Sequence, residues 1–392
     1  LVIFDTYTQW SGFGQLVIIT LIEIGGLGFI SAFSMLMFFL KKKAGFKEKL
    51  VIAQSFSVSD MSEVLNIQRL VLIGSMTVQG IGAIILFLIF KIRYNYNFAL
   101  SIKLGLFHAV SAFCNAGFDI LGFVTPGSSL LEFNDSYALL ITLDLLVIIG
   151  GLGFLVWQEL IDLKKKKKLS LYAKLVLSTS LLLLSIGTIG FAVLEWYNVE
   201  TIGNMDIGHK LLNAFFQSVT VRTAGFDAIN QAGLTEAAKM FAVPLMLIGG
   251  SSGSTAGGVK TVTFIVIMMF LFSRMRGTER IRIDKKEVSM KQVLDALTLF
   301  CIVIILVFGG AIFINLTSPI NFVDAVYETS SALGTVGLTT GVTTLLSSPA
   351  KVMIILFMYF GRVGILTISM GFLVGNKSND KIKYSDAKLL IG

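Results

Sequence analysis

The sequence has few of the side chains from which enzymes and metal proteins usually build their sites. Its 392 residues include two cysteines, two histidines and four prolines. Cys114 and Cys301 lie far apart in apolar helical pattern, which predicts neither a disulfide nor a metal site. His108 and His209 do not occupy equivalent places, so they predict no metal site either. Because no combination of nucleophile, base and acid is apparent, we do not expect an enzyme, and no covalent cofactor is expected.

Charged residues are also scarce. They make up 14% of the chain, against roughly 25% in soluble domains, and apolar residues make up 55%. Several apolar runs reach the roughly 20 residues that a helix needs to cross a bilayer. The composition therefore predicts an all-α polytopic membrane protein, in contact with membrane lipid, with room for about eight spans.

The net charge of +8 comes from basic clusters that lie between apolar runs. The clusters are Lys41, Lys42, Lys43, Lys47 and Lys49, then residues 164–168, then residues 274–286. Positive-inside bias places these connections in the cytoplasm of a cell-membrane protein, although Lys91, Arg93 and Lys103 do not fit that assignment. The clusters serve as topology signals and lipid contacts, or as a docking surface for a cytosolic partner. No nucleic-acid partner is expected.

Three glycine-centred turns recur between the apolar runs. They are Asn115, Ala116, Gly117 and Phe118; Thr223, Ala224, Gly225 and Phe226; and Thr335, Val336, Gly337 and Leu338. Around each turn the order is an apolar helix, a short amphipathic stretch, the turn and a second apolar helix. The expected elements are 68–92, 103–115 and 137–161, then 171–196, 209–221 and 236–273, then 288–316, 321–333 and 348–374. This order predicts internal repeats.

The second helices carry a glycine-rich element of their own, at residues 24–29, 149–154, 248–253 and 360–365. Four copies predict four repeats, with boundaries at 1–43, 44–168, 169–286 and 287–392. The spacing from Gly225 to Gly250 and from Gly337 to Gly361 places the turn that would match Gly25 at the very start of the chain. We therefore expect a first repeat that lacks its N-terminal part. Close helix packing is the alternative explanation for these glycines.

Non-helical backbone at membrane depth is tolerated where it is buried in protein or lines a watery cavity. Rings of backbone carbonyls can replace the hydration shell of a cation in a narrow pore. Glycine permits positive φ, so it allows carbonyls to turn toward one axis. If the short amphipathic stretches are helices that point their carbonyl ends at that axis, they favour cations there. The turns therefore predict a path for cations.

These turns resemble the filter segments of the Trk/Ktr/HKT superfamily of potassium transporters, and most closely those of its bacterial Ktr-type membrane subunit. The resemblance rests on residues 111–119, 218–227 and 334–341 and extends over essentially the whole chain. It implies four helix, pore-helix, helix repeats around a pseudo-fourfold pore, with K⁺ held by backbone carbonyls of the three turns. It also implies a homodimer, a ring of cytosolic nucleotide-binding regulatory subunits (KtrA- or TrkA-like), and Na⁺ as an activator.

A sodium-permeable or sodium-coupled member of the same superfamily is the first alternative. In that superfamily the residue at the first filter position helps to separate potassium-selective from sodium-permeable members, and this position belongs to the turn that the expected first repeat lacks. A non-transporting membrane scaffold or enzyme is the distant one. The regulatory partner is expected at the basic connections and near residues 377–388.

The third repeat has a second helix interrupted by Gly249, Gly250, Ser251, Ser252, Gly253, Ser254, Thr255, Ala256, Gly257 and Gly258, followed by Lys260. This stretch lacks the lysine position and the preceding strand of a phosphate-binding loop. The resemblance implies an intramembrane gating loop below the filter, and a purely architectural helix break is the alternative.

Three charged residues fall inside apolar runs, where a charge is costly. Arg362 is expected to face the pore as a positive barrier that moves with gating, or else to tether the carbonyls of the gating loop. Glu23 and Asp144 are expected to be buried tethers rather than ion ligands.

Overall fold

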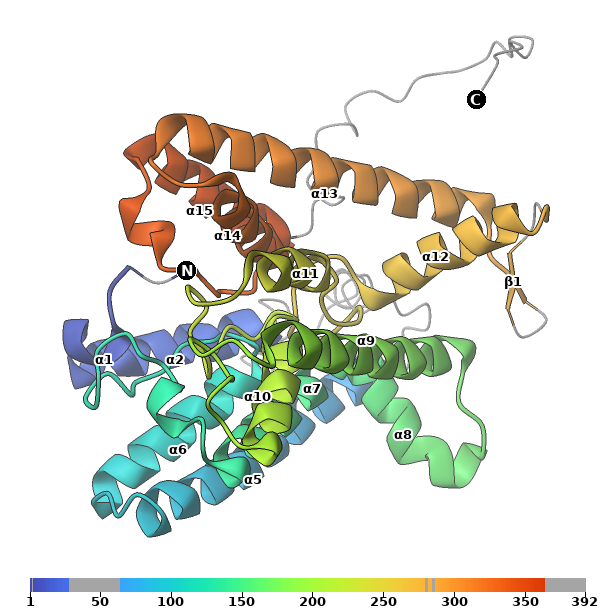
Figure 1. The fold of residues 1–392 in the computed structure, drawn as a ribbon. Helices are drawn as coiled ribbons and strands as arrows, with labels where there is room; N and C mark the ends of the chain where they lie inside the picture. Colours follow the sequence, from blue (N-terminus) through green and yellow to red (C-terminus); the bar gives the residue numbers. More distant parts are fainter. Residues whose placement is uncertain (2, 28–63, 279–280, 284–285, 364–392) are drawn as a thin grey trace.

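The computed structural model describes residues 1, 3–27, 64–278, 281–283 and 286–363, which form a bundle of helices (Figure 1). The helices are α1 (Thr6–Gln9), α2 (Gly12–Leu27), α5 (Val64–Ile92), α6 (Phe98–Phe113), α7 (Tyr137–Leu152), α8 (Phe154–Lys166), α9 (Leu171–Glu195), α10 (Ile207–Thr220), α11 (Glu236–Leu247), α12 (Thr261–Met275), α13 (Met290–Thr317), α14 (Phe322–Gly334) and α15 (Ser348–Val363). Two 3₁₀ turns lie at Leu131–Phe133 and Val342–Leu345.

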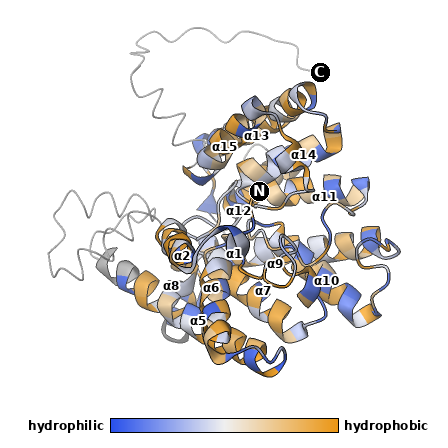
Figure 2. Ribbon diagram, turned by 90° about the vertical axis from the view of Figure 1, so that its left-hand side faces the viewer, coloured by the Kyte–Doolittle hydropathy of each residue, from blue (hydrophilic) through white to orange (hydrophobic). Residues whose placement is uncertain are grey.

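Three of these helices are long and apolar enough to cross a membrane, at Arg69–Ile92, Leu171–Glu195 and Met290–Thr317. Their outer faces carry exposed apolar side chains, and Ile84, Leu181 and Ile305 are each more than 60% exposed. In Figure 2 the ribbons of α5, α9 and α13 carry many residues coloured as hydrophobic. Large exposed apolar surfaces of this kind are typical of contact with lipid.

Three shorter helices pack against the long ones: α6 against α5, α10 against α9, and α14 against α13. They have 16, 14 and 13 residues, so they are too short to span a bilayer of about 30 Å at 1.5 Å per residue. They occur where the sequence predicted short amphipathic helices, although α6 begins at Phe98 rather than at residue 103.

The second helices differ from the prediction in one respect. We expected a single helix over 137–161, but α7 and α8 meet at Gly153 with a bend of 97°. Gly153 has φ of 89°, which a right-handed helix cannot contain. The break predicted within residues 236–273 is present, because α11 ends at Leu247 and α12 begins at Thr261. The helix α15 is described to Val363.

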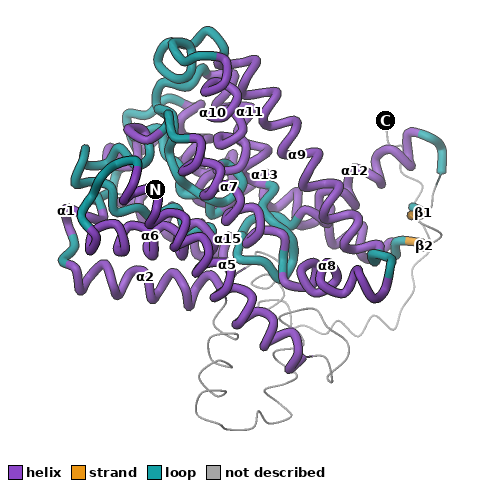
Figure 3. Tube along the Cα trace, turned by 90° about the horizontal axis from the view of Figure 1, so that it is seen from below, coloured by secondary structure: helices purple, strands orange, loops and turns teal. Residues whose placement is uncertain are grey.

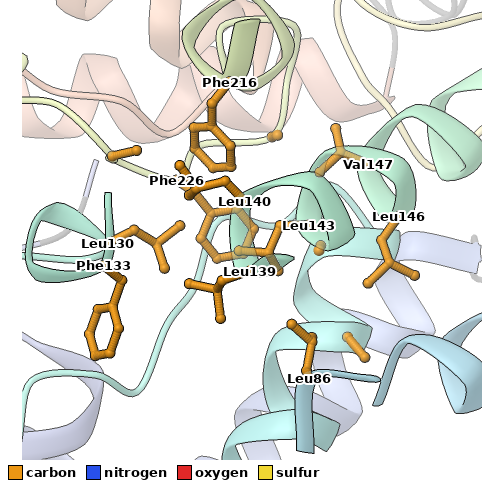
Figure 4. Packing of buried hydrophobic residues seen from close by; sticks show 14 of the residues in the cluster. Leu86, Leu130, Phe133, Leu139, Leu140, Leu143, Leu146, Val147, Phe216 and Phe226 are labelled. Carbon is orange, nitrogen blue, oxygen red and sulfur yellow. The ribbon is translucent and has the colours of Figure 1, made fainter. Parts of the chain in front are cut away.

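The core links helices from different parts of the chain. Its largest cluster joins leucines and phenylalanines of α5, α6 and α7 to Phe216 of α10 and to Phe226, which follows a turn glycine (Figure 4). Because Phe226 and Phe216 are at most 2% exposed, the turn at Gly225 is anchored in a core to which α5, α6 and α7 all contribute. At roughly 1.5 to 3 kcal/mol for each fully buried large side chain, this anchoring is substantial.

The connection between α12 and α13 contains a short antiparallel hairpin of β1 (Arg282–Ile283) and β2 (Lys286–Glu287), which the all-helical prediction did not include. Figure 3 shows that the loops around α1 and α10 lie at the end of the molecule away from this hairpin. Two expected basic sites, Lys41 to Lys49 and residues 377–388, lie outside the described residues.

Candidate functional site

Three short turns, each centred on a glycine, meet in the interior of the protein. Gly117, Gly225 and Gly337 have positive φ, at 70°, 87° and 101°. A Cβ atom added to Gly117 would lie 2.5 Å from the carbonyl oxygen of Ala224, and one added to Gly225 would overlap that of Val336. Positive φ and such close neighbours both favour glycine. Turns from three distant parts of the chain are therefore in contact.

The residue two positions before each turn glycine is also left-handed. Asn115, Thr223 and Thr335 have φ of 52°, 72° and 55°, which is uncommon for residues with a Cβ atom. The residue between them and the glycine does not share this conformation. Residues with positive and negative φ therefore alternate in all three turns, a regularity that the glycine pattern alone did not predict.

A hydroxyl group at the end of each short helix fixes the carbonyl that follows the turn glycine. Ser111 Oγ donates to Phe118 O at 2.6 Å, Thr220 Oγ1 donates to Phe226 O at 2.8 Å, and Ser331 Oγ donates to Leu338 O at 2.6 Å. The sequence analysis did not assign a role to these hydroxyls. Their place a few residues before each glycine is a signal that could have identified them.

The three short helices end at the three turns. Side chains of Asn97, Asp206 and Asn321 cap their far ends by accepting backbone N–H groups. The carbonyl end of an α-helix carries about half an elementary negative charge. Three partial negative charges therefore converge where the turns meet.

The non-helical segment of residues 248–260 packs directly against these turns. Thr255 Oγ1 lies 3.0 Å from Phe113 O and 3.1 Å from Asn115 Oδ1. A Cβ atom added to Gly249 would lie 3.1 Å from the Thr223 methyl group, and one added to Gly257 would overlap Thr335 Oγ1. The segment therefore touches the left-handed residue of every one of the three turns.

The bend at Gly153 holds the other side of the 248–260 segment. Ser251 N donates to Gly151 O at 3.1 Å, and Phe154 N donates to Gly253 O at 2.9 Å. The helix α7 thus stops where its backbone begins to bond to this segment. Close packing accounts for a neighbouring glycine, because a Cβ atom on Gly150 would overlap Phe113 O.

Cationic side chains bind the carbonyl groups of the segment. Arg362 Nη1 donates to Thr255 O at 2.6 Å, and its Nη2 donates to Gly25 O. Lys260 Nζ donates to Ala256 O at 2.8 Å. Arg222 Nη2 donates to Gly249 O at 3.1 Å. The bond from Arg362 to Thr255 O is the tether that was the alternative to a positive barrier for this residue. The role of Arg222 was not predicted, although its charge beside a turn was a visible signal.

A cavity of about 330 Å³ lies beside the turns. Its lining includes Asn115 and Gly117 of one turn, Thr335 and Gly337 of another, and Arg362. The predicted turn residues and the predicted charge therefore share one space.

Comparison with known proteins identifies the family of this chain. Residues 1–384 match the family model of TrkH, described as a cation transport protein. The chain belongs to the TrkH family.

Individual relatives of this TrkH-family chain include potassium transporters. It is 38% identical to potassium/sodium uptake protein NtpJ of Enterococcus hirae, over 99% of this chain and 85% of the relative. It is 34% identical to Ktr system potassium uptake protein B of Bacillus subtilis, over 100% of this chain and 86% of the relative. The crystal structure of the potassium transporter TrkH from Vibrio parahaemolyticus matches with a TM-score of 0.70 and 16% identity, over 91% of this chain and 72% of that one.

These relatives are cation transporters rather than enzymes, as the sequence analysis expected. Together with the long apolar helices, they make the TrkH-family chain a multi-pass helical membrane protein. The resemblance to the Trk and Ktr transporters is thereby confirmed.

The two acidic residues inside apolar runs have different surroundings. Glu23 Oε2 accepts from Gln79 Nε2 at 2.9 Å and from Cys114 Sγ at 3.3 Å, so it has the tethers that were expected. Asp144 is buried, and neither carboxyl oxygen has a hydrogen-bond partner among the described residues of this TrkH-family chain. The tether expected of Asp144 is therefore not seen there.

Proposed function

We propose that this chain is the pore-forming membrane subunit of a potassium uptake system. Transport is channel-like, with K⁺ moving downhill through a filter of backbone carbonyls. The observation that carries the proposal is that three turns with the same alternating backbone, at the carbonyl ends of three short helices, meet at one place. The relatives, which include potassium uptake proteins, support it.

In this proposal the selectivity filter consists of the three turns at residues 115–118, 223–226 and 335–338. Alternation of positive and negative φ allows successive carbonyls to face one side, which is what a partly dehydrated cation requires. Helix ends that carry partial negative charge favour cations over anions without adding full charges that would hold the ion too tightly.

The 248–260 segment acts as the gate. Its charged residues are Lys260, within the segment, and Arg362, which binds to the segment from α15. Its support is position, because it touches the left-handed residues of all three turns and carries cationic partners on its carbonyls. A positive charge below the filter opposes the passage of a cation, and displacement of the segment removes that barrier. The membrane potential supplies about 2.3 kcal/mol per charge per 100 mV, so this chain needs no hydrolysis to accumulate K⁺.

The proposed architecture has four repeats, divided at 1–43, 44–168, 169–286 and 287–392, around a pseudo-fourfold axis. Subunits form a homodimer in the cell membrane with the basic connections in the cytoplasm. There they bind a ring of nucleotide-binding regulatory subunits, and Na⁺ serves as an activator. An assembly of several subunits is supported by the relatives that are named as parts of a Ktr system.

The test is the flux of K⁺ and Na⁺ into proteoliposomes that carry the full-length protein, with and without Gly225→Ser. A serine at Gly225 would need positive φ and would overlap Val336 O, so the preference for K⁺ is expected to collapse. Gly309→Ser is the matched control, because a Cβ atom there has no neighbour within 4 Å. Selective flux that survives Gly225→Ser would contradict the filter.

A sodium-permeable or sodium-coupled transporter is the second candidate, and the Enterococcus relative, a potassium/sodium uptake protein, favours it. The same assay separates the two. Equal flux of both ions in the unmodified protein would support the sodium-permeable candidate.

A further inference from the structure

A buried hydrogen-bond network joins two of the short helices behind the glycine turns. It consists of Gln217 of α10, Gln231 in the segment after the turn at Gly225, and Tyr327 of α14. The side chains are at most 3% exposed. Buried polar groups of this kind are costly unless their hydrogen bonds are made.

Gln231 uses its whole hydrogen-bonding capacity in this network. Its Oε1 accepts from Gln217 Nε2 at 2.7 Å and from the Tyr327 hydroxyl at 2.8 Å. Its Nε2 donates to Gln217 Oε1 at 3.0 Å and to Ile229 O at 2.9 Å. A glutamine amide offers two acceptor sites and two donors, and all four are occupied here. The amide is therefore held in one orientation.

The position of the network connects it to the turns. Gln217 and Gln231 lie on either side of Gly225 in the chain, and Tyr327 lies on the helix that leads to Gly337. The network thus fixes the turn at Gly225 relative to the turn at Gly337. On its other side, the segment after Gly225 is joined to the second repeat, because Leu130 N donates to Asp227 O at 2.9 Å.

We propose that Gln231 is a positioning residue for ion selectivity, which acts by setting the separation of the turns at Gly225 and Gly337 through Gln217 and Tyr327. The inference rests on the proposed filter. A carbonyl ring discriminates between cations through the place and number of its oxygens, so a shift of one turn alters the preference. No atom of the network needs to touch the ion.

The experiment compares K⁺ and Na⁺ flux in proteoliposomes for the full-length protein and five variants. Tyr327→Phe removes one hydroxyl, and Gln231→Leu removes all four bonds of the amide at similar volume. We expect the K⁺ to Na⁺ flux ratio to fall by about threefold in Tyr327→Phe and by about tenfold in Gln231→Leu, as the loss of one or several buried bonds would produce. The double variant should equal Gln231→Leu, because Tyr327 acts through Gln231.

Tyr197→Phe is the control, since it removes the same hydroxyl from a side chain that is 88% exposed. A purely structural network would lower the midpoint of thermal unfolding without changing the flux ratio, and that result would overturn the inference. If Gln231→Leu does not fold, Tyr327→Phe alone decides between these results. Gly225→Ser, measured in the same assay, separates the two proposals. If the K⁺ to Na⁺ flux ratio collapses in Gly225→Ser but is unchanged in the network variants, only the inference about Gln231 is refuted. If the ratio is unchanged in Gly225→Ser, the proposed filter itself is refuted.

Discussion

The glycine turns and the 248–260 segment are both non-helical stretches inside a bundle of apolar helices, but they satisfy their polar groups differently. Each turn is bonded by the helix that leads into it, as when Ser331 Oγ donates to Leu338 O. The 248–260 segment takes several of its bonds from distant elements, including the Gly151 carbonyl and the Arg362 guanidinium.

Because their bonds have different partners, we expect the glycine turns and the 248–260 segment to behave differently. Bonds to the adjoining helix persist as long as that helix is folded, so the turns keep one geometry. Bonds to distant elements break when those elements move apart, and polar backbone at membrane depth then needs water or new partners. The turns are therefore suited to selecting an ion, and the 248–260 segment is suited to being released.

The largest effect is expected from Arg362→Gln, which weakens the hold on the segment. A hydrogen bond to a charged group is worth about 1.5 to 3 kcal/mol, so its loss should raise the leak of K⁺ and Na⁺ by about tenfold or more. Tracer flux into proteoliposomes measures this leak. Lys351→Gln is the control, because Lys351 lies on the same helix and bonds to Thr344 O instead. Unchanged flux in a well-folded Arg362→Gln protein would show that Arg362 is not a barrier to cations.

Arg222→Gln sharpens the comparison, because Arg222 adjoins the turn at Gly225 in sequence but binds Gly249 O of the 248–260 segment. The account expects a change in rate, of about fivefold, and little change in the K⁺ to Na⁺ ratio. Bi-ionic reversal potentials give the ratio, and tracer flux gives the rate. A fall in the ratio with no change in rate would assign Arg222 to the turn instead.

Ser331→Ala tests the local bond of a turn. Loss of one buried hydrogen bond, worth about 0.5 to 1.5 kcal/mol, should lower the K⁺ to Na⁺ ratio by about threefold and leave the leak unchanged. Ser178→Ala removes the same kind of hydroxyl-to-carbonyl bond from an exposed helix face and should change neither. Increased leak in Ser331→Ala, without loss of selectivity, would contradict the division between the two stretches.

The smallest effect concerns His209, at the exposed start of α10 and away from both stretches. Its hydrogen bond with the Asp206 carboxylate raises the pKa of His209 and lowers the pKa of Asp206. The His209 contribution to stability is fully present below its unfolded pKa of about 6.5 and is lost as pH rises through its raised pKa. The Asp206 contribution is lost as pH falls through its lowered pKa.

Thermal unfolding of the detergent-solubilised protein, measured from about pH 5 to about pH 9, should therefore show a small loss above neutrality. His209→Gln should remove that loss, because glutamine does not titrate. An identical pH profile in the two proteins would show that the pair contributes nothing measurable.

The sequence predicted those features that depend on local composition. The long apolar runs predicted α5, α9 and α13, and the glycine and serine content of residues 248–260 predicted the break between α11 and α12. The turns were predicted because Gly117, Gly225 and Gly337 recur in equivalent surroundings. Their roles as a filter and a gate remain proposals.

Features that depend on distant partners could not be read from the sequence. Gly153 lies in an apolar run that looks like continuous helix, and its bend coincides with the bond from Phe154 N to Gly253 O, which joins residues far apart in the chain. The Arg222 bond to Gly249 and the Gln231 network also depend on such partners. The tether expected for Asp144 is not seen among the described residues, since sequence position shows burial better than it shows hydrogen-bond partners.

The most direct test of the central claim is backbone hydrogen exchange of the full-length protein in lipid nanodiscs, compared with that of Arg362→Gln. The account predicts that amides of residues 249–258 exchange faster in the variant, while those of 223–226 and 335–338 keep their protection. Equal acceleration in both stretches, or none in either, would contradict the claim that the turns are fixed by their own helices and the segment by its distant partners.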